Sequence, residues 1–476
     1  MSAVALPMVI QGGMGIGVSN WHLARAVSLR GQLGVVSGTA LDSLFVRRLQ
    51  DGDIGGHIRR AMEKFPFPDV SAAALKKYFV PEGRDDGTAY ALLAMYRQTV
   101  DRVRDRMTML ANFVEVHMAK EGHDGSVGIN LLTKVQMPNL ASLYGAMLAG
   151  VDYVLMGAGI PKEIPGALDA LAAGEPASLR FDVQQNGNGR EEALTLDPRE
   201  HWDGDPPKLK RPQFLPIISS HSLARMLVRK ANGRVDGFVI EGPVAGGHNA
   251  PPRGKVLHNA RGEPVYGERD APDLAVMRDI GLPFWLAGGM GSPEGLAQAR
   301  ADGAAGIQVG TLFAYSDESG LDQCYKDRVL AKVRSGEIDV VTDDRASPTG
   351  FPFKVVQLEG SNAGEKHYRA RKRVCDLGYL RQAYRGDDGR IRYRCAAEPV
   401  ETYVKKGGAR EDTVGRKCLC NALMADIGRP QSRNGGGPER PILTSGDDLL
   451  NMGRFLNGRA SYTADDVLDY LLSGCH

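Results

Sequence analysis

Short apolar runs recur along the chain as far as residue 309, and a turn and then a helical spacing of apolar positions follow most of them. A strand buried on both faces forms such a continuous apolar run, and its alternation with helices is typical of a parallel sheet. Eight runs fit this description: Met8–Gln11, Leu33–Ser37, Val127–Leu131, Val151–Met156, Phe214–Ser219, Gly237–Glu241, Pro283–Ala287 and Gly306–Val309. Because eight parallel strands close a barrel, we predict an α/β protein with a (β/α)8 TIM-barrel fold.

Helical patterns between these runs supply the outer layer of the predicted barrel. They cover Asn20–Arg30, Asn139–Ala149, Ser220–Lys230, Ala271–Ile280 and Ser292–Ala301, and most of them end at a glycine, as helix C-termini prefer. Residues 41–122 are too long for a simple crossover and hold several helical segments, including a long amphipathic one near Tyr90–Lys120. We therefore predict a barrel over residues 1–315 with a helical insertion at 41–122.

The periodicity weakens beyond residue 315, where charged helix and loops rich in Gly and Pro lead to a last apolar helix at Ala464–Leu472. We predict that residues 316–476 form a C-terminal extension that acts as a lid or as a homodimer contact.

Charge and cysteine content exclude several classes of protein. The chain has 59 Lys plus Arg against 57 Asp plus Glu, which lacks the basic excess of a nucleic-acid-binding face. No apolar run approaches the ~20 residues that span a bilayer, and the N-terminus has no basic start or A-x-A site. Cys418 and Cys420 lack the repeated C-x2-4-C spacing of a zinc site. We expect a cytoplasmic protein without membrane, nucleic acid or metal.

The first glycine cluster follows the first predicted strand and reads Gly12-Gly13-Met14-Gly15-Ile16-Gly17. Glycines there let a phosphate or a planar ring approach the backbone, although they also suit a tight turn between strand and helix. Val18 stands where a dinucleotide fingerprint needs its third glycine, and no Gly-Lys-Ser/Thr follows as in a P-loop. The cluster alone leaves both interpretations open.

Two further glycine turns carry more information, because they follow the seventh and eighth strands. They are Gly288-Gly289-Met290-Gly291 and Gly310-Thr311. In a (β/α)8 barrel the loops after these two strands commonly bind phosphate through backbone N–H groups. We therefore predict a ligand that carries a phosphate.

His248 is the candidate for chemistry. It ends the sequence Gly246-Gly247-His248 after the sixth strand, which places its imidazole at the mouth of the barrel, where it can donate, accept or take a proton. Arg253, five residues later, is a candidate second contact for an anionic substrate.

Together, Gly246-Gly247-His248, the paired glycine turns and Gly128-Ile129-Asn130-Leu131 resemble the nitronate monooxygenase family, also called the 2-nitropropane dioxygenase family. The resemblance covers about residues 5–315 and implies an FMN-dependent barrel. It implies that Gln11, Gly12, Gly13 and Asn130 contact the flavin ring or ribityl chain, and that His248 faces the substrate. Around the phosphate it places Gly246, Gly247, Gly288, Gly289, Gly310 and Thr311.

The sequence also departs from the family pattern near His248. Val244 stands where the family usually has an acidic residue, and Ala250 stands where it usually has a glycine. The loop that opens with Pro251-Pro252-Arg253 is expected to reshape the pocket, so these differences bear on the substrate more than on the flavin.

The resemblance implies oxidation of an alkyl nitronate, or of a related carbanionic substrate, by FMN and O2. A close branch of the family suggests an alternative, the reduction of an enoyl thioester or enoyl-acyl-carrier-protein with NAD(P)H. A barrel that binds a phosphorylated ligand without redox chemistry is the second alternative.

Overall fold

The computed structural model describes residues 6–99, 101–184, 191–433 and 437–474. Its centre is a sheet of eight parallel strands in the order β1-β11-β10-β9-β8-β4-β3-β2. The outer strands meet through the hydrogen bonds Gln11 N to Leu33 O (2.9 Å) and Leu33 N to Val9 O (3.1 Å), which close the barrel. The strands are β1 Val9–Gln11, β2 Gly34–Ser37, β3 Val127–Leu132, β4 Tyr153–Gly157, β8 Gln213–Ile218, β9 Phe238–Glu241, β10 Phe284–Ala287 and β11 Gly306–Val309. The predicted barrel is confirmed, and each strand overlaps its predicted run.

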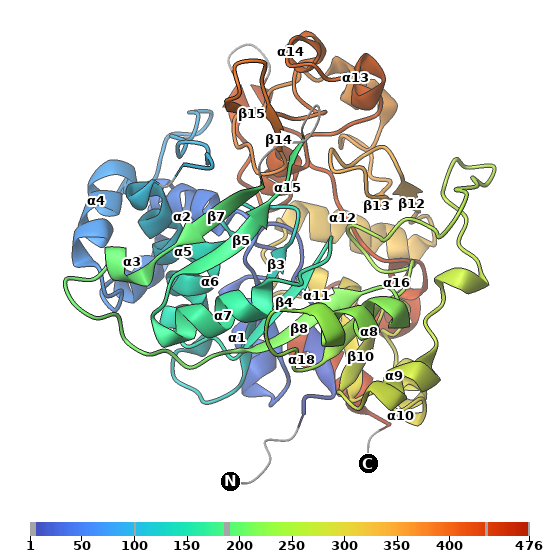
Figure 1. Cartoon of the computed structure of the whole chain (residues 1–476). Coiled ribbons are helices and arrows are strands. Elements are labelled where there is room, and N and C mark those ends of the chain that lie inside the picture. The colour runs from blue at the N-terminus through green and yellow to red at the C-terminus, as the bar shows by residue number, and fades with distance from the viewer. Residues whose placement is uncertain (1–5, 100, 185–190, 434–436, 475–476) are drawn as a thin grey trace.

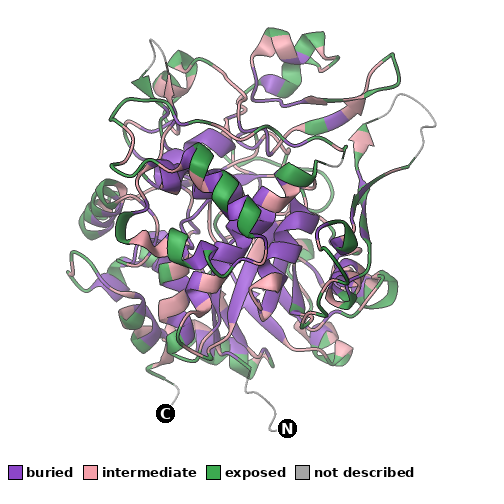
Figure 2. Cartoon of the chain, turned by 90° about the vertical axis from the view of Figure 1, so that its left-hand side faces the viewer, coloured by how far each residue is buried: buried purple, intermediate pink, exposed green. Residues whose placement is uncertain are grey.

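Two apolar layers hold the barrel. A small cluster that includes Ile10, Val35, Leu155 and Trp285 packs among strand residues that point inward, and a larger one fills the space between the strands and the surrounding helices. The strands are almost wholly buried in Figure 2, while the outer faces of the surrounding helices are exposed. This double burial explains why the strands are apolar runs rather than alternating patterns.

Helices cover the barrel between its strands. They are α1 Trp21–Leu29, α6 Asn139–Leu148, α7 Ile164–Ala173, α8 His221–Lys230, α9 Leu274–Ile280, α10 Pro293–Ala301 and the short α11 Thr311–Ala314. Side chains of Asn20, Ser220, Asp273 and Ser292 accept hydrogen bonds at the first turns of α1, α8, α9 and α10, which fixes where these helices begin.

The helical insertion lies beside the barrel (Figure 1). It contains α2 Leu41–Gln50, α3 His57–Met62, α4 Pro68–Tyr78 and α5 Arg102–Lys120, with a short 3-10 turn at Ile54–Gly56. The expected helix start near Tyr90 is wrong, because α5 begins at Arg102 behind the Asp101 cap. The backbone N–H of Tyr90 donates to Gln431 and that of Ala91 donates to Gln50, so side chains take the hydrogen bonds that a helix would make.

A smaller set of elements leaves the barrel after α7. The antiparallel pair β5 Ala177–Phe181 and β7 Glu192–Leu196 packs against α6 and α7, and β6 Val183–Gln184 joins β14 of the extension. Short 3-10 turns lie at Pro198–Glu200 and Glu268–Asp270.

The extension winds back over the barrel, so that much of it lies opposite the two chain ends in Figure 1. Its helices are α12 Gln323–Ser335, α13 Glu365–Ala370, α14 Val400–Lys405, α15 Leu419–Asp426, α16 Asp448–Asn451, α17 Gly453–Leu456 and α18 Ala464–Leu472, with a 3-10 turn at Arg410–Thr413. Its strands are β12 Val340–Asp343, β13 Phe353–Val356, β14 Gln382–Arg385, β15 Ile391–Arg394, β16 Ser432–Arg433 and β17 Gly437–Pro438. The predicted division of the chain into domains stays a prediction, as does the homodimer contact.

The structure bears on two of the excluded classes, membrane proteins and metal-binding proteins. Within the described ranges, no helix combines the length and the apolar character needed to cross a bilayer. Cys375, Cys395, Cys418 and Cys420 line one small cavity in the extension. No group of three or more His, Cys, Asp or Glu side chains suited to a metal ion occurs among the residues described.

Candidate functional site

A pocket opens at the carboxyl ends of the barrel strands, where the sequence placed its candidate residues. Its walls come from the loops after the first, sixth, seventh and eighth barrel strands and from three segments of the extension. Eight of the ten residues that the family resemblance assigned to the flavin line it: Gly12, Gly13, Asn130, Gly246, Gly247, Gly288, Gly310 and Thr311. Their binding roles stay predictions.

The wall after β1 depends on glycine. A Cβ added to Gly13 would lie 2.3 Å from the Cβ of Asn130, so no side chain fits at Gly13 without moving β3. The amide nitrogen of Asn130 donates to the Gly13 carbonyl at 3.3 Å, which joins the two strands across the floor. The first glycine cluster therefore keeps this wall thin, as a ligand that stacks on the backbone requires.

Gln11 lies behind this wall rather than on it. Its side chain is fully buried, donates to Ser19 Oγ at 2.8 Å and accepts from Val35 N at 3.0 Å. The structure therefore places Gln11 inside the fold, where it holds β1 against β2.

The opposite wall holds the two glycine turns of the predicted phosphate site. Gly288 and Gly289 both have left-handed backbones, with φ of 85° and 76°, so the loop after β10 can turn sharply while its amides stay free of side chains. Gly288 and Gly310 line the pocket, whereas Gly289 is not among its lining residues. Thr311 is buried and accepts from Gly446 N at 3.0 Å.

His248 lines the pocket and is positioned by the extension. Its Nε2 lies 2.7 Å from Ser347 Oγ, and its backbone pairs with that of Phe353. The Phe353 ring meets the imidazole edge to face, with 4.9 Å between centroids. Removal from solvent lowers the pKa of His248 to about 4, so the imidazole is neutral at physiological pH.

Glu241 is a second ionisable group in the pocket that the sequence reasoning missed. It ends β9, is half-buried and lines the pocket. Desolvation raises the pKa of Glu241 to about 8, so the side chain is largely protonated at neutral pH. Its signal in the sequence was an acidic residue that closes an otherwise apolar strand, Phe238-Val239-Ile240.

Two buried amide oxygens in the pocket have no hydrogen-bond partner among the described residues. They belong to Asn130 on β3 and to Gln308 on β11, and both residues line the cavity. Buried polar atoms are nearly always satisfied, so an unpaired pair that faces one cavity indicates that a polar ligand completes it. Gln308 was also missed, although it is the one polar side chain of Gly306–Val309.

Arg253 lies apart from these residues. It is exposed, its backbone N–H donates to Asp270 Oδ1 at 2.8 Å, and its guanidinium reaches the Ser219 carbonyl at 3.5 Å. It is not among the residues that line the pocket, so its predicted contact with substrate has no support from this arrangement.

Residues 208–345 match the sequence profile of the family described as nitronate monooxygenase, and this stretch contains β8 to β11 with Glu241, His248 and both phosphate-site turns. A probable nitronate monooxygenase of Staphylococcus saprophyticus is 31% identical over 153 residues, which are 32% of this chain and 40% of the relative. A (3aS,4S,5R,7aS)-5-hydroxy-7a-methyl-1-oxo-octahydro-1H-indene-4-carboxyl-CoA dehydrogenase of Rhodococcus jostii is 25% identical over 201 residues, 42% of this chain and 50% of the relative. The matches therefore span at most half the length of these curated relatives.

Solved structures resemble the whole chain more distantly. FabK from Thermotoga maritima superposes with a TM-score of 0.46 at 16% identity. The superposition covers 99% of this chain and 93% of the FabK chain. A nitroalkane oxidase from Streptomyces ansochromogenes gives a TM-score of 0.46 at 15% identity. That superposition covers 98% of this chain and 95% of the oxidase. The fold rests on the strand order above. By the matches of sequence, residues 208–345 are similar to the nitronate monooxygenase family.

Proposed function

We propose that the protein is an FMN-dependent oxidoreductase that oxidises alkyl nitronates, or related carbanionic substrates, with O2. The observation that carries the proposal is one pocket in which His248, the glycine walls and the unpaired amides of Asn130 and Gln308 face the same space. The match of residues 208–345 to the nitronate monooxygenase family supports a flavin, and the geometry offers a place for it.

The residues present fit a flavin mononucleotide. Gly12, Gly13 and Asn130 would hold the ring and the ribityl chain, since the glycines leave a flat wall and the amide oxygen of Asn130 needs a donor. Gly288, Gly310 and Thr311 would hold the phosphate through backbone N–H groups and a hydroxyl. Bound there, the flavin would supply the electron acceptor that the protein side chains lack.

His248 would orient the substrate and handle its proton. A neutral imidazole can donate one hydrogen bond and accept another, and it can take the α-proton of a neutral nitroalkane. Because the pKa of His248 is lowered to about 4, protonation of this residue removes no activity between pH 8 and pH 6. Ser347 holds the ring by its Nε2, which leaves Nδ1 as the second functional atom.

Replacement of His248 tests this role. We expect His248→Ala to retain its yellow flavin and to lower kcat/KM for nitronate oxidation by about 10- to 100-fold, because the anionic substrate loses the hydrogen bond that orients it. The matched control is His258→Ala, since His258 is exposed and pairs with Asp344. Turnover at the wild-type rate by flavin-loaded His248→Ala would refute the catalytic role.

A second function, reduction of an enoyl thioester by NAD(P)H, is favoured by the charge of the pocket. Its described lining residues include the carboxyls of Glu241 and Asp448 but no Lys or Arg, so an anionic nitronate meets no cationic side chain there. A neutral thioester carbonyl avoids that cost and can accept from the Glu241 acid or the imidazole. The Rhodococcus relative is itself named for a CoA-linked substrate.

Anaerobic mixing separates the functions. Bleaching of the flavin absorbance by a nitronate, but not by NADH or NADPH, supports the monooxygenase. Bleaching by a nicotinamide followed by reoxidation with an enoyl thioester supports the reductase. A colourless purified protein that binds no added flavin would contradict both and would favour the barrel without redox chemistry.

A further inference from the structure

The phosphate end of the pocket is completed by a segment of the extension, Thr444–Asp448. Gly247 N donates to Thr444 Oγ1 at 2.8 Å, and Asp447 N donates to the Val244 carbonyl at 2.9 Å. Gly446 N donates to Thr311 Oγ1 at 3.0 Å, which ties the segment to the loop after β11 as well. The segment is therefore a fixed wall of the site rather than a loosely attached lid.

No Lys or Arg is found among the described residues that line the pocket, so no cationic side chain of theirs receives a phosphate at this end. Among the described residues that line it, the ionisable side chains are those of Glu241, His248 and Asp448. Lys354 on β13 contacts the segment Thr444–Asp448, and its ammonium is bound to both carboxylate oxygens of Asp447, at 2.7 and 2.8 Å. Binding of a phosphate there would depend on backbone N–H groups and on whether the Asp448 carboxyl is protonated.

Asp448 lies against the loop after β10. Its Oδ2 is 3.0 Å from the point that a Cβ on Gly291 would occupy, in the same turn as Gly288 and Gly289. Burial raises the pKa of the Asp448 carboxyl, the N–H of Gly291 acts in the opposite direction, and the charge of Asp447 raises the pKa further. Tyr315 also borders the segment through its hydroxyl contact with Ser445 Oγ at 2.7 Å.

We propose that Asp448 belongs to the phosphate subsite and makes cofactor affinity depend on its own protonation. A protonated carboxyl can donate a hydrogen bond to a phosphate oxygen, whereas an ionised one repels the phosphate across a poorly solvated space. The Asp448 carboxylate therefore weakens FMN binding relative to riboflavin, and FMN affinity falls as this carboxyl loses its proton. This inference rests on the proposed flavin site and adds a residue from the extension that no motif marked.

The test compares FMN with riboflavin, which has the same ring and ribityl chain but no phosphate. Dissociation constants are measured by flavin fluorescence on the full-length protein between pH 6.5 and 8.5, above the second phosphate pKa of about 6. Because Glu241 also titrates in this range, the quantity compared is the ratio of the two constants at each pH. For wild type, the FMN constant should rise relative to that of riboflavin by up to about tenfold per pH unit.

Variants of Asp448 test whether its carboxyl causes the pH dependence of the ratio of the two dissociation constants. Asp448→Asn keeps the shape and removes the charge, so its ratio should stay constant within about threefold, and FMN should bind more tightly than to wild type at pH 8.5. Asp448→Ser provides a second uncharged variant if the first folds poorly. The matched control is Glu294→Gln, an exposed carboxyl three residues beyond Gly291, which should keep the wild-type dependence.

The outcomes separate the two proposals. Binding of both flavins with a wild-type ratio that does not change with pH would overturn the role of Asp448 and leave the flavin site intact. The same holds if Asp448→Asn keeps the wild-type dependence. Failure of both flavins to bind at any pH would overturn the proposed function together with this inference.

Discussion

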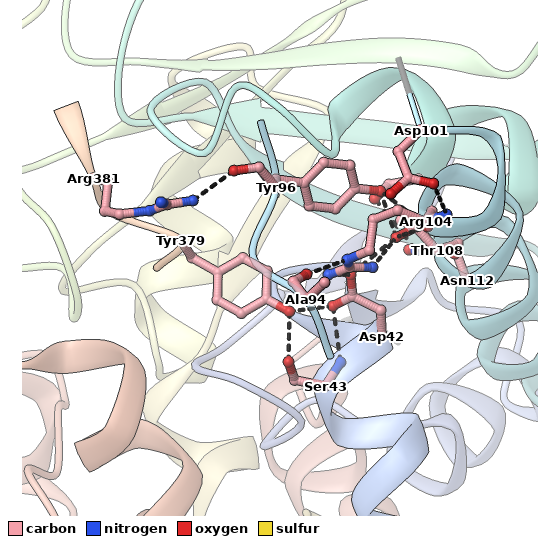
Figure 3. A network of polar contacts seen from close by, with 11 residues as sticks. Asp42, Ser43, Ala94, Tyr96, Asp101, Arg104, Thr108, Asn112, Tyr379 and Arg381 are labelled. Atoms are coloured by element: carbon pink, nitrogen blue, oxygen red, sulfur yellow. Dashed lines mark hydrogen bonds and ion pairs between the residues drawn. The ribbon is translucent and has the colours of Figure 1, made fainter. Parts of the chain in front are cut away.

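Two groups of polar side chains in this chain are paired in opposite ways. The first, which we call the Asp42 cluster, contains Asp42, Arg104, Thr108, Tyr96 and Tyr379 (Figure 3). Arg104 Nη2 lies 2.7 Å from Asp42 Oδ2, Thr108 donates to the same oxygen at 2.9 Å, and Tyr379 donates to the other. Every charge in this cluster has an opposite charge or a hydroxyl in contact with it.

The pocket is the second group, and some of its polar atoms have no partner. Among the described residues, Asn130 and Gln308 each have an amide oxygen without a partner, and Glu241 has no opposite charge to hold it ionised. Burial alone would raise the pKa of Asp42 too, but Arg104 and the Tyr379 hydroxyl more than offset it and keep that pKa below its ordinary value. The same desolvation thus gives an ionised carboxylate in one place and a neutral acid in the other.

The difference in pairing separates a cluster that holds the fold together from a pocket that is suited to bind a ligand. The Asp42 cluster joins the insertion to the extension, because Asp42 and Arg104 lie on α2 and α5 and Tyr379 comes from beyond residue 316. Satisfied groups of this kind fix how segments pack. Unsatisfied groups cost stability and are retained where a ligand completes them.

The largest effect should come from unpairing the Asp42 cluster. Arg104→Met leaves the Asp42 carboxylate buried without its cation, which should lower the free energy of unfolding by about 3–5 kcal/mol. Urea-induced unfolding followed by circular dichroism measures this loss. The control is Arg102→Met on the same helix, where the exposed pair with Glu200 should contribute less than about 1 kcal/mol. Equal losses in the two variants would show that the cluster is not the brace that its contacts indicate.

Replacing Glu241 in the pocket should increase the free energy of unfolding, by less than the loss expected for Arg104→Met. The pKa of Glu241 is raised to about 8 from 4.5, so the folded protein keeps a proton that the unfolded chain has lost. Folding stability therefore decreases as pH rises from 4.5 towards 8, and Glu241→Gln removes this dependence. We expect the variant to exceed wild type by roughly 1–3 kcal/mol at pH 8 and by much less at pH 5.

Urea midpoints at pH 5 and pH 8 measure the difference, and the exposed Glu337→Gln serves as the control. A Glu241→Gln variant that gained nothing on going from pH 5 to pH 8 would mean that the carboxyl is ionised and solvated in the folded protein.

The sequence predicted the barrel well because its information is local. Each strand is a continuous apolar run, and the glycine turns at Gly12, Gly288 and Gly310 lie next to strand ends, so both the fold and the walls of the pocket followed from short windows of sequence. Helix α5 was misplaced at its start because distant side chains of Gln50 and Gln431 bind the backbone around Tyr90.

What the extension adds to the pocket could not be predicted in this way. Ser347 contacts His248 across 99 residues, and Thr311 contacts Gly446 across 135. No periodicity or spacing records such contacts, so Phe353, Ser347 and Asp448 carried no signal. Gln308 and Glu241 did carry one, since each interrupts or ends an apolar strand whose neighbours face the core.

The smallest effect tests the side-chain hydrogen bond between His248 and Ser347 of the extension. Ser347 is fully buried, and its hydroxyl also contacts Thr349 Oγ1 at 2.8 Å, so it can serve the imidazole without moving. Unfolding free energies of Ser347→Ala, His248→Ala and the double variant form a cycle whose coupling energy should be about 1 kcal/mol, as for a buried neutral hydrogen bond. A coupling near zero would mean that the imidazole turns away from Ser347 in solution, and Nε2 rather than Nδ1 would then be the nitrogen available to substrate.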